Sequence, residues 1–322
     1  MSHLFKIAGL TLAVVACATP AVAGDFVPGG NAGTLARQFA LPALGDASVL
    51  QRGHVDTRWT LDVINEYVVE GSCAAECVVF DGETSRIRYS YRLGLGDGWD
   101  FGFEVPLLDR GGGFLDGWIE DWHGAFDLPN GERELAAQDQ YRFHYERQNV
   151  VLLDETRGGS VIGDATLAVG RRWGRSGVLR AMARLPTGDE DALENGNGGY
   201  AIWAERELAI PPGGGGYLAA GVSHNDRGRF LPAMQNRTIA FGGLGLRYPL
   251  TRSVWLTAQI QVHGRLYDGS TLTPLQRAGM PLTLGLQFRT GARSVFELGF
   301  QEDPSLNGSP DFVLYLSHRS AG

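Results

Sequence analysis

Apolar and polar residues alternate with a period of two along most of the chain, from about residue 54 to the C-terminus. The alternation comes in segments of roughly ten residues, separated by clusters of Gly, Asp, Asn and Pro. In the clearest segment, Arg86–Leu93, one face carries Ile, Tyr, Tyr and Leu, and the other carries Arg, Arg, Ser and Arg. Such a strand either buries its apolar face in a soluble sandwich or turns that face to lipid, with the arginines around a wet interior.

The lengths of the connections favour the second architecture. From residue 161 onward, short turns and long loops alternate strictly, as in an up-and-down outer-membrane barrel with short periplasmic turns. The sequence therefore predicts an all-β fold: a closed antiparallel transmembrane barrel of twelve strands. The expected strands are 54–69, 84–95, 98–106, 161–173, 177–187, 198–210, 215–224, 237–248, 252–264, 280–290, 293–301 and 311–318. Fourteen strands is the alternative, with residues 141–154 split into a hairpin.

The turn at residues 96–98 predicts a register. If two strands pair symmetrically about Asp97, Tyr91 lies opposite Phe103 and Leu93 lies opposite Phe101. Glu104 then falls among the arginines of the preceding strand, so the charges of the polar face compensate one another.

The polar faces of the expected strands supply candidates for the lining of a lumen. These candidates are Arg86, Arg88, Arg92, Glu104, Arg180, Arg184, Glu205, Glu207, Gln259, Gln261 and His263. A pore needs no catalytic group, because width and fixed charge set its selectivity. The same mixture of Arg and Glu could equally form a plug of ion pairs in a closed structural barrel.

The N-terminus has the pattern of an export signal. Lys6 precedes the apolar run Ile7–Thr19, and Ala21–Ala23 forms a small-x-small cleavage site before Gly24. A competing interpretation makes Cys17 a lipid anchor. We expect a signal peptide at 1–23, a periplasmic segment at 24–53 and the barrel at 54–318.

Composition agrees with export of a β-protein. The 322 residues are 43% hydrophobic and 20% charged, so they can bury a core, and 46 glycines against 14 prolines favour many tight turns. The mean hydropathy of −0.11 is too low for a bundle of membrane helices. The formal net charge of −8 argues against nucleic acid as a partner.

Two cysteines remain after the signal, Cys73 and Cys77. In an exported chain, a close pair of this kind predicts a local disulfide. A metal site would need more ligands than this stretch offers, and we expect neither a metal nor a cofactor.

Residues 111–130 interrupt the strand pattern with helical spacing. Phe114, Trp118 and Trp122 recur on one face, while Asp121 and His123 belong to the polar remainder. We expect a short amphipathic helix in a long extracellular loop. It is either a lid on the barrel rim, a helix in the membrane interface or a platform for a ligand.

Three motifs carry a resemblance to a known family. They are Asp97-Gly98-Trp99, Gly112-Gly113-Phe114-Leu115-Asp116 continuing to Asp121-Trp122-His123, and Leu185-Pro186-Thr187-Gly188-Asp189. On these residues the chain resembles, from about residue 35 onward, the bacterial family called domain of unknown function 3187. The resemblance implies an outer-membrane barrel and brings no established functional residue. The third motif is also similar to one in barrels encoded near aromatic-degradation pathways, which are suspected uptake channels. The ending His318–Gly322 departs from the terminal aromatic residue that is usual in such barrels.

The main functional hypothesis is a channel or uptake pore for small solutes in the outer membrane of a Gram-negative bacterium. The expected partners are membrane lipid, lipopolysaccharide, the barrel assembly machinery and an unknown small solute. A barrel-borne lipid hydrolase is an alternative that would use Ser223 and His224, although neighbouring residues of a strand point to opposite faces. A soluble periplasmic β-protein is the other alternative.

Overall fold

The protein is described by a computed structural model that covers residues 26–126, 139–189, 193, 197–211, 213–304 and 308–322, apart from the side chains of Trp122, His123, Ala125 and Phe126. The expected signal peptide, its cleavage site and Cys17 lie outside the described residues.

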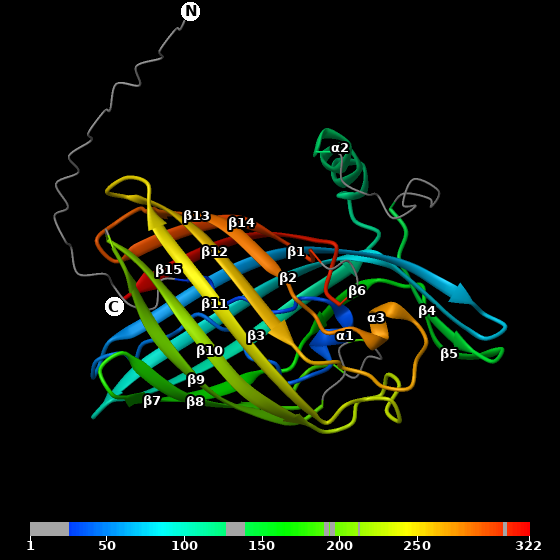
Figure 1. Cartoon of the computed structure of the whole chain (residues 1–322), viewed down its shortest axis with the longest axis horizontal. Coiled ribbons are helices and arrows are strands. Elements are labelled where there is room, and N and C mark those ends of the chain that lie inside the picture. Colours follow the sequence, from blue (N-terminus) through cyan, green and yellow to red (C-terminus); the bar gives the residue numbers. More distant parts are fainter. Residues whose placement is uncertain (1–25, 127–138, 190–192, 194–196, 212, 305–307) are drawn as a thin grey trace, which may run out of the picture.

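Twelve antiparallel strands form a closed ring in which β1 pairs with β15 (Figure 1). They are β1 (Val55–Ser72), β2 (Glu76–Gly96), β3 (Trp99–Gly111), β7 (Thr166–Trp173), β8 (Gly177–Arg184), β9 (Gly199–Ile210), β10 (Gly214–Asn225), β11 (Thr238–Pro249), β12 (Val254–His263), β13 (Leu282–Arg289), β14 (Ser294–Glu302) and β15 (Phe312–Ala321). The prediction of a twelve-stranded up-and-down barrel is confirmed. A closed ring leaves no unpaired sheet edge, which a bilayer requires because lipid cannot hydrogen-bond a backbone.

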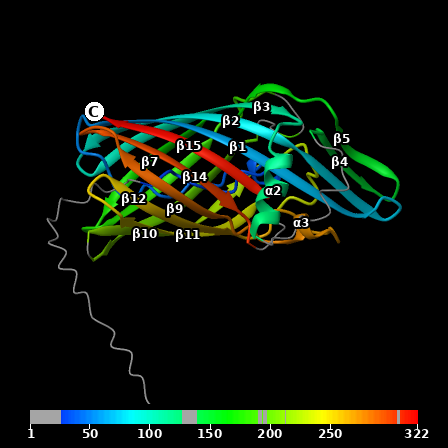
Figure 2. The same ribbon diagram turned by 90° about the horizontal axis from the view of Figure 1, so that it is seen from above.

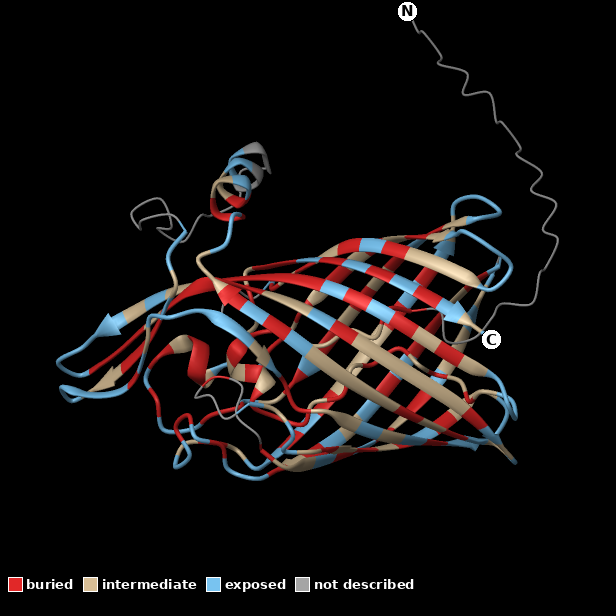
Figure 3. Ribbon diagram, turned by 180° about the vertical axis from the view of Figure 1, so that it is seen from behind, coloured by how far each residue is buried: buried red, intermediate tan, exposed pale blue. Residues whose placement is uncertain are grey.

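Buried and exposed residues alternate along the strands of the barrel (Figure 3). Outward-facing Trp59, Leu218 and Leu314 are 53%, 53% and 41% exposed, whereas inward-facing Thr257 and Gln287 are each 1% exposed. Large apolar side chains therefore cover the outer surface and polar ones fill the interior. This inverted organisation is that of an outer-membrane barrel, and it places the protein in the outer membrane.

The predicted register between β2 and β3 is confirmed. Tyr91 lies opposite Phe103 and Leu93 lies opposite Phe101, with Glu104 opposite Ser90 on the inner face. The two rings of the first pair stack with centroids 5.4 Å apart. Asp97 makes the tight turn with φ of 54°, a left-handed conformation that Asp tolerates better than most residues.

Three further strands extend the sheet beyond the ring. β4 (Arg142–Arg147) pairs with β5 (Val150–Glu155) and with residues 76–81 of β2, while β6 (Gly159–Ile162) pairs with residues 107–110 of β3. Figure 2 shows the β4 and β5 hairpin projecting past the long-loop end. The hairpin considered within residues 141–154 thus exists, but it adds no strands to the closed ring.

The described part of the expected periplasmic segment, residues 26–53, lies inside the barrel, and we call it the plug. Phe26 packs edge-to-face on Tyr217 near the short-turn end. The plug then reaches the long-loop end at helix α1 (Thr34–Arg37), where Glu66 accepts bonds from the amide and hydroxyl of Thr34, and returns to the turn at Asp97. The periplasmic expectation is thereby corrected. The physical reason is that a barrel of this size is wider than its own side chains fill.

An apolar cap closes the long-loop end of the barrel. Phe39 of the plug packs there with Phe80 of β2, Tyr145 of β4, and Phe230 and Tyr267 of two long loops. The short helix α3 (Thr273–Gln276) belongs to the same region. The plug and the loops therefore share one hydrophobic core, so movement of either disturbs the other.

Helix α2 (Asp116–Phe126) packs against the outside of the wall (Figures 1 and 2). Leu115 and Ile119 are buried against Val63 and Phe312, which face outward from β1 and β15. Phe114 and Trp118, in contrast, are 69% and 45% exposed, and Asp121 is exposed as well. No helix in the described residues is both long and apolar enough to cross a bilayer. Exposed aromatics beside the outer wall favour the interpretation of a helix in the membrane interface over a lid.

The N-terminal end of α2 is held by side chains of the barrel wall. Glu83 accepts hydrogen bonds from the amides of Phe114 and Leu115, and Asn65 donates to Asp116. A carboxylate at this position also suits the positive end of a helix. The side chains of Trp122 and His123, which were also predicted for this helix, lie outside the described residues.

The cap depends on a buried carboxylate above the ring, Glu76. Burial by itself would raise the pKa of Glu76, but hydrogen bonds from Tyr145, Ser270 and Thr271 outweigh it and lower the pKa to about 2. Because this pKa lies below the ordinary value of 4.5, the stabilisation is complete above pH 4.5 and is lost as the pH falls toward 2.

We expect Glu76→Gln to weaken the cap by about 2–3 kcal/mol at pH 7. Hydrogen exchange of the peptide covering residues 265–279, corrected for intrinsic rates, measures the change. Near pH 2 the variant and the wild type should converge. Asp268→Asn, an exposed acid of the same loop, is the control. Equal protection of Glu76→Gln and wild type at neutral pH would contradict this role.

Candidate functional site

The structure places the predicted lumen-lining side chains on the inner face of the barrel. Buried or half-buried inward positions are held by Arg86, Arg88, Arg92, Glu104, Arg180, Arg184, Glu205, Gln259, Gln261 and His263. Glu207 shares the face of Glu205, two residues nearer the short-turn end of β9, and is half-buried. All these positions follow from the alternation of the strands.

One group of charges joins β1, β2 and β3. Arg88 donates from Nε to Asp62 at 2.9 Å, and Arg86 forms an ion pair with the same carboxylate at 2.9 Å. Glu104 lies 3.8 Å from Arg88 and accepts a hydrogen bond from Ser90. The two guanidinium groups therefore share a small number of acidic partners.

A second group joins β2, β3 and β8 to the plug. Arg92 and Arg180 both pair with Asp100, at 2.6 and 3.0 Å. Arg92 also pairs with Asp46 of the plug at 2.9 Å. Arg180 donates to the backbone oxygens of Asp46 and Ser48. The arginines of the wall thus hold the returning leg of the plug.

The arginine at the end of β8 occupies a break in the wall. Arg184 pairs with Asp164 at 2.7 Å, between β6 and β7. The motif that follows β8 bonds to the same break: Gly188 donates to Asp164, and Thr187 accepts from the amide of Ala165. The Nη1 atom of Arg184 is buried and has no hydrogen-bond partner among the described residues.

The ascending leg of the plug is held by bonds to its backbone. Arg58, Gln259 and Arg88 donate to the oxygens of Phe26, Val27 and Pro28, respectively. The two legs pair with each other through Gly29 and Leu44, which form two backbone hydrogen bonds of 2.9 and 3.1 Å. No described residue of the plug belongs to a strand of the wall.

Apolar contacts anchor the plug on the opposite wall. Leu44 is 1% exposed and packs in a cluster with Trp203, Tyr217 and Phe241. A side chain at Gly243 would place its Cβ only 2.9 Å from Leu44, so the bare backbone makes room for the plug. These three aromatic residues were not predicted from the sequence as part of the lumen lining. Their position on the inward, polar face of a strand was the signal that could have identified them.

A cavity of about 230 Å³ lies between the plug and the arginine-bearing wall. Six arginines and three carboxylates line it: Arg37, Arg86, Arg88, Arg92, Arg180 and Arg184, with Asp46, Glu104 and Asp164. Apolar side chains complete the lining, including Phe39, Leu41, Met182 and Phe241. The cavity is therefore amphiphilic, with an excess of positive charge.

The remaining candidates serve other contacts. The Nε2 atom of His263 lies 2.8 Å from the side-chain Nδ2 atom of Asn31 in the plug. Ser223 is 1% exposed and faces inward, where Asn225 donates to it, whereas His224 is half-buried and contacts Thr238. Ser223 and His224 point to opposite faces, so they do not form a nucleophile and its base.

The comparisons with known proteins agree with this fold. The family model described as "Protein of unknown function (DUF3187)" matches residues 7–320. No curated protein matches the chain. The COG4313 outer membrane channel from Pseudomonas putida F1 superposes with a TM-score of 0.54 at 13% identity, covering 87% of this chain and 99% of that one. The CymD monoaromatic hydrocarbon channel gives 0.42 at 10% identity, covering 85% and 89%. At 13% identity, the similarity to the Pseudomonas putida channel shows a shared fold.

We expect Leu44→Ala to loosen the plug, because removing a fully buried leucine costs about 2–5 kcal/mol. Single-channel recordings in planar bilayers measure the effect as longer or more frequent open events. Leu218→Ala on the lipid-facing side of β10 is the control. Gating of Leu44→Ala identical to that of wild type and control would show that the plug does not govern the pathway.

Proposed function

The chain belongs to the DUF3187 family, and we propose that it is a gated outer-membrane channel for small organic anions. The observation that carries the proposal is the amphiphilic, arginine-rich cavity between the plug and the wall. A channel needs a continuous path, fixed charge along it and no catalytic group. The Pseudomonas putida relative in fold is itself described as an outer membrane channel, which supports this class.

The fixed charge of the cavity favours a solute of the opposite charge. Six arginines and three carboxylates line the cavity, and Asp62 and Asp100 pair with four of these arginines, so a small excess of positive charge remains. The buried Nη1 of Arg184 has no hydrogen-bond partner among the described residues. Guanidinium groups bind carboxylates through charge-assisted bonds. The favoured solute therefore carries a carboxylate or a similar anionic group.

Apolar lining selects the body of the solute. Phe39, Leu41, Met182 and Phe241 face the same space as the arginines. The volume of 230 Å³ is below the range of about 300–1,000 Å³ that is typical of ligand pockets, so the solute is small. An anion with a compact apolar body, such as an aromatic carboxylate, matches both features.

The plug is the gate of the proposed channel. It fills the lumen through side chain to backbone bonds, the ion pair of Asp46 with Arg92 and apolar contacts, without joining the strands of the wall. Its displacement leaves the hydrogen bonds of the ring intact, so opening does not require the barrel to unfold. Phe39 links the plug to the cap, and opening therefore involves the extracellular loops as well.

A closed structural barrel is the second candidate, because the same plug and cap fill the lumen in this structure. In either case, membrane lipid surrounds the barrel. We further propose that the exposed aromatics of α2 contact lipopolysaccharide and that the barrel assembly machinery inserts the chain through β15. The inner position of Tyr315 and the outer position of Phe312 supply the aromatic residues near its end.

Planar-bilayer currents of the full mature protein test the channel. We expect anion-selective currents in a salt gradient, and a reduction of the chloride current by benzoate, which occupies the cavity. Benzylammonium has a similar ring with the opposite charge and is the matched solute control. Silence over many insertions would overturn the channel and leave the closed structural barrel.

The variant Arg184→Gln tests the role of the cavity charge. Removing one positive charge about 5 Å from a passing ion changes its energy by about 0.8 kcal/mol in water, a roughly fourfold loss of anion preference. The shift in reversal potential measures this loss. Arg252→Gln in an exposed turn is the control and should retain the wild-type selectivity. An unchanged reversal potential in Arg184→Gln would place the ion path elsewhere.

A further inference from the structure

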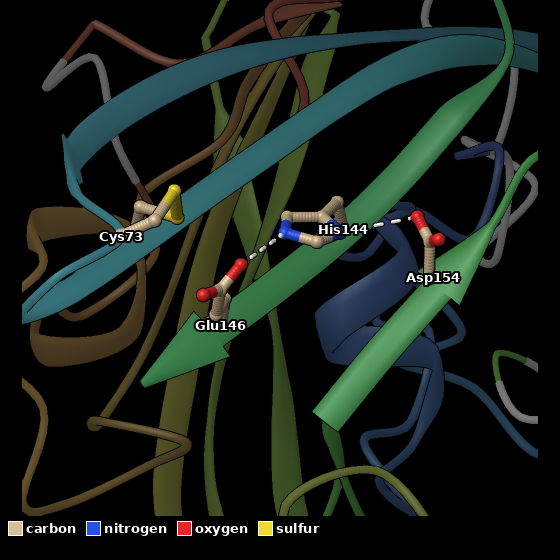
Figure 4. The surroundings of a disulfide bond; sticks show 5 residues. Cys73, His144, Glu146 and Asp154 are labelled. Atoms are coloured by element: carbon tan, nitrogen blue, oxygen red, sulfur yellow. Dashed lines mark hydrogen bonds and ion pairs between the residues drawn. A yellow bond between two sulfur atoms is a disulfide. The ribbon is translucent and has the colours of Figure 1, made fainter. Parts of the chain in front are cut away.

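The pairing of β2 with β4 brings further side chains to the disulfide of Cys73 and Cys77. The S–S bond joins the two sides of the β1 and β2 hairpin tip. Glu146 of β4 lies opposite Cys77, and His144 lies opposite Val79, two residues further along β2. Because residues two apart share a face, His144 and Glu146 lie on the same face as Cys77. Figure 4 shows both side chains beside the disulfide of Cys73.

The four side chains form a compact set of ligand atoms. One atom from each of Cys73, Cys77, His144 and Glu146 lies within 4.8 Å of all the others. Ligand atoms of a tetrahedral zinc ion lie roughly 3.4–3.8 Å apart, as its bond lengths of about 2.0–2.3 Å require. Small side-chain movements at a hairpin tip therefore suffice to close the set around a metal ion.

The histidine is already oriented for metal binding by a second carboxylate. Its Nδ1 lies 3.1 Å from Asp154 Oδ1 on β5, and its Nε2 lies 3.3 Å from Glu146. A carboxylate on one ring nitrogen, with the other nitrogen directed at the metal, is the usual arrangement around zinc-bound histidine. Asp154 is thus a positioning residue and not a ligand.

We propose that reduction of the Cys73–Cys77 disulfide turns this cluster into a zinc site, with Cys73, Cys77, His144 and Glu146 as ligands. A dithiol supplies two electrons and two protons, the S–S bond breaks, and the dithiol closes into its own disulfide. When Zn²⁺ binds, the two thiols release their protons to water and two S–Zn bonds form. The disulfide and the metal site are alternative states of the same cluster.

The chemistry of the set fits zinc. Two thiolates, an imidazole and a carboxylate are zinc ligands, and the three residues between the cysteines fall in the usual spacing of two to four. Cys73 is exposed, so a dithiol and the metal ion can reach it from solution. In the oxidised protein the sulfurs are bonded to each other and supply no thiolate.

Zinc binding to the full mature barrel, before and after treatment with dithiothreitol and its anaerobic removal, tests the proposal. We expect one equivalent of Zn²⁺ to bind to the reduced protein in competition with a chromophoric chelator. X-ray absorption should show two sulfur ligands at about 2.3 Å and nitrogen or oxygen ligands at about 2.0–2.2 Å. The oxidised protein should not compete with the chelator.

Variants separate the ligands from the positioning residue. The double variant Cys73→Ser/Cys77→Ser should not compete with the chelator, whether or not it has been treated with dithiothreitol. Asp154→Asn should lower the affinity about 10- to 100-fold with the count of sulfur ligands unchanged. Asp226→Asn, an exposed acid of another loop, is the matched control and should bind as wild type does.

Two results would overturn the zinc site. One is reduced wild-type protein that binds Zn²⁺ no more tightly than the double serine variant. The other is equal binding to oxidised and reduced protein, which would assign the metal to ligands other than the thiolates. Because the measurement reports metal and not current, its outcome is independent of the channel experiment.

Discussion

Enclosed guanidinium groups govern the internal organisation of this barrel. A charge withdrawn from bulk water costs several kcal/mol unless partners compensate it. Arg88, Arg180 and Arg319 are each less than a tenth exposed, and each has a carboxylate partner on another strand. The wall alone does not supply enough acceptors, and the plug provides the remainder through Asp46 and its backbone oxygens. The position of the N-terminal segment thus follows from the need to satisfy the arginines.

The ring of strands and the plug are held by different kinds of interaction. Strand pairing closes the ring, and breaking a backbone hydrogen bond of the ring is energetically costly because the surrounding lipid cannot replace it. The plug has no such requirement, because water can replace the side chain to backbone bonds that hold it. A lumen filled by a segment that joins no strand of the wall, beside a positive cavity, has the parts that the proposed gated channel requires. The cap couples that segment to the extracellular loops through Phe39.

Local and long-range information differ sharply at the hairpin of β1 and β2. The disulfide was predictable, because Cys73 and Cys77 are four residues apart in an exported chain. The ligand cluster was not, since His144 joins it only through the pairing of β4 with β2. The expectation that this stretch offers too few ligands concerned the stretch alone, whereas the pairing of β4 with β2 brings His144 and Glu146 beside it. The acidic partners Asp62 and Asp100 were recoverable in principle, because they follow the same alternation as the predicted arginines.

By itself, the sequence predicted a ring of twelve strands, with fourteen as the alternative, the register about Asp97 and the inward face of the candidate charges. All of these follow from a period-two pattern that a bilayer enforces on every strand. Only the tertiary structure decided what fills the lumen and what meets at the extracellular tip. Residues 26–53 carry no alternation, and Leu44 meets Gly243 through packing that no local pattern records. Contacts between distant segments depend on shape and on unpaired charge, and these exist only once the barrel has closed.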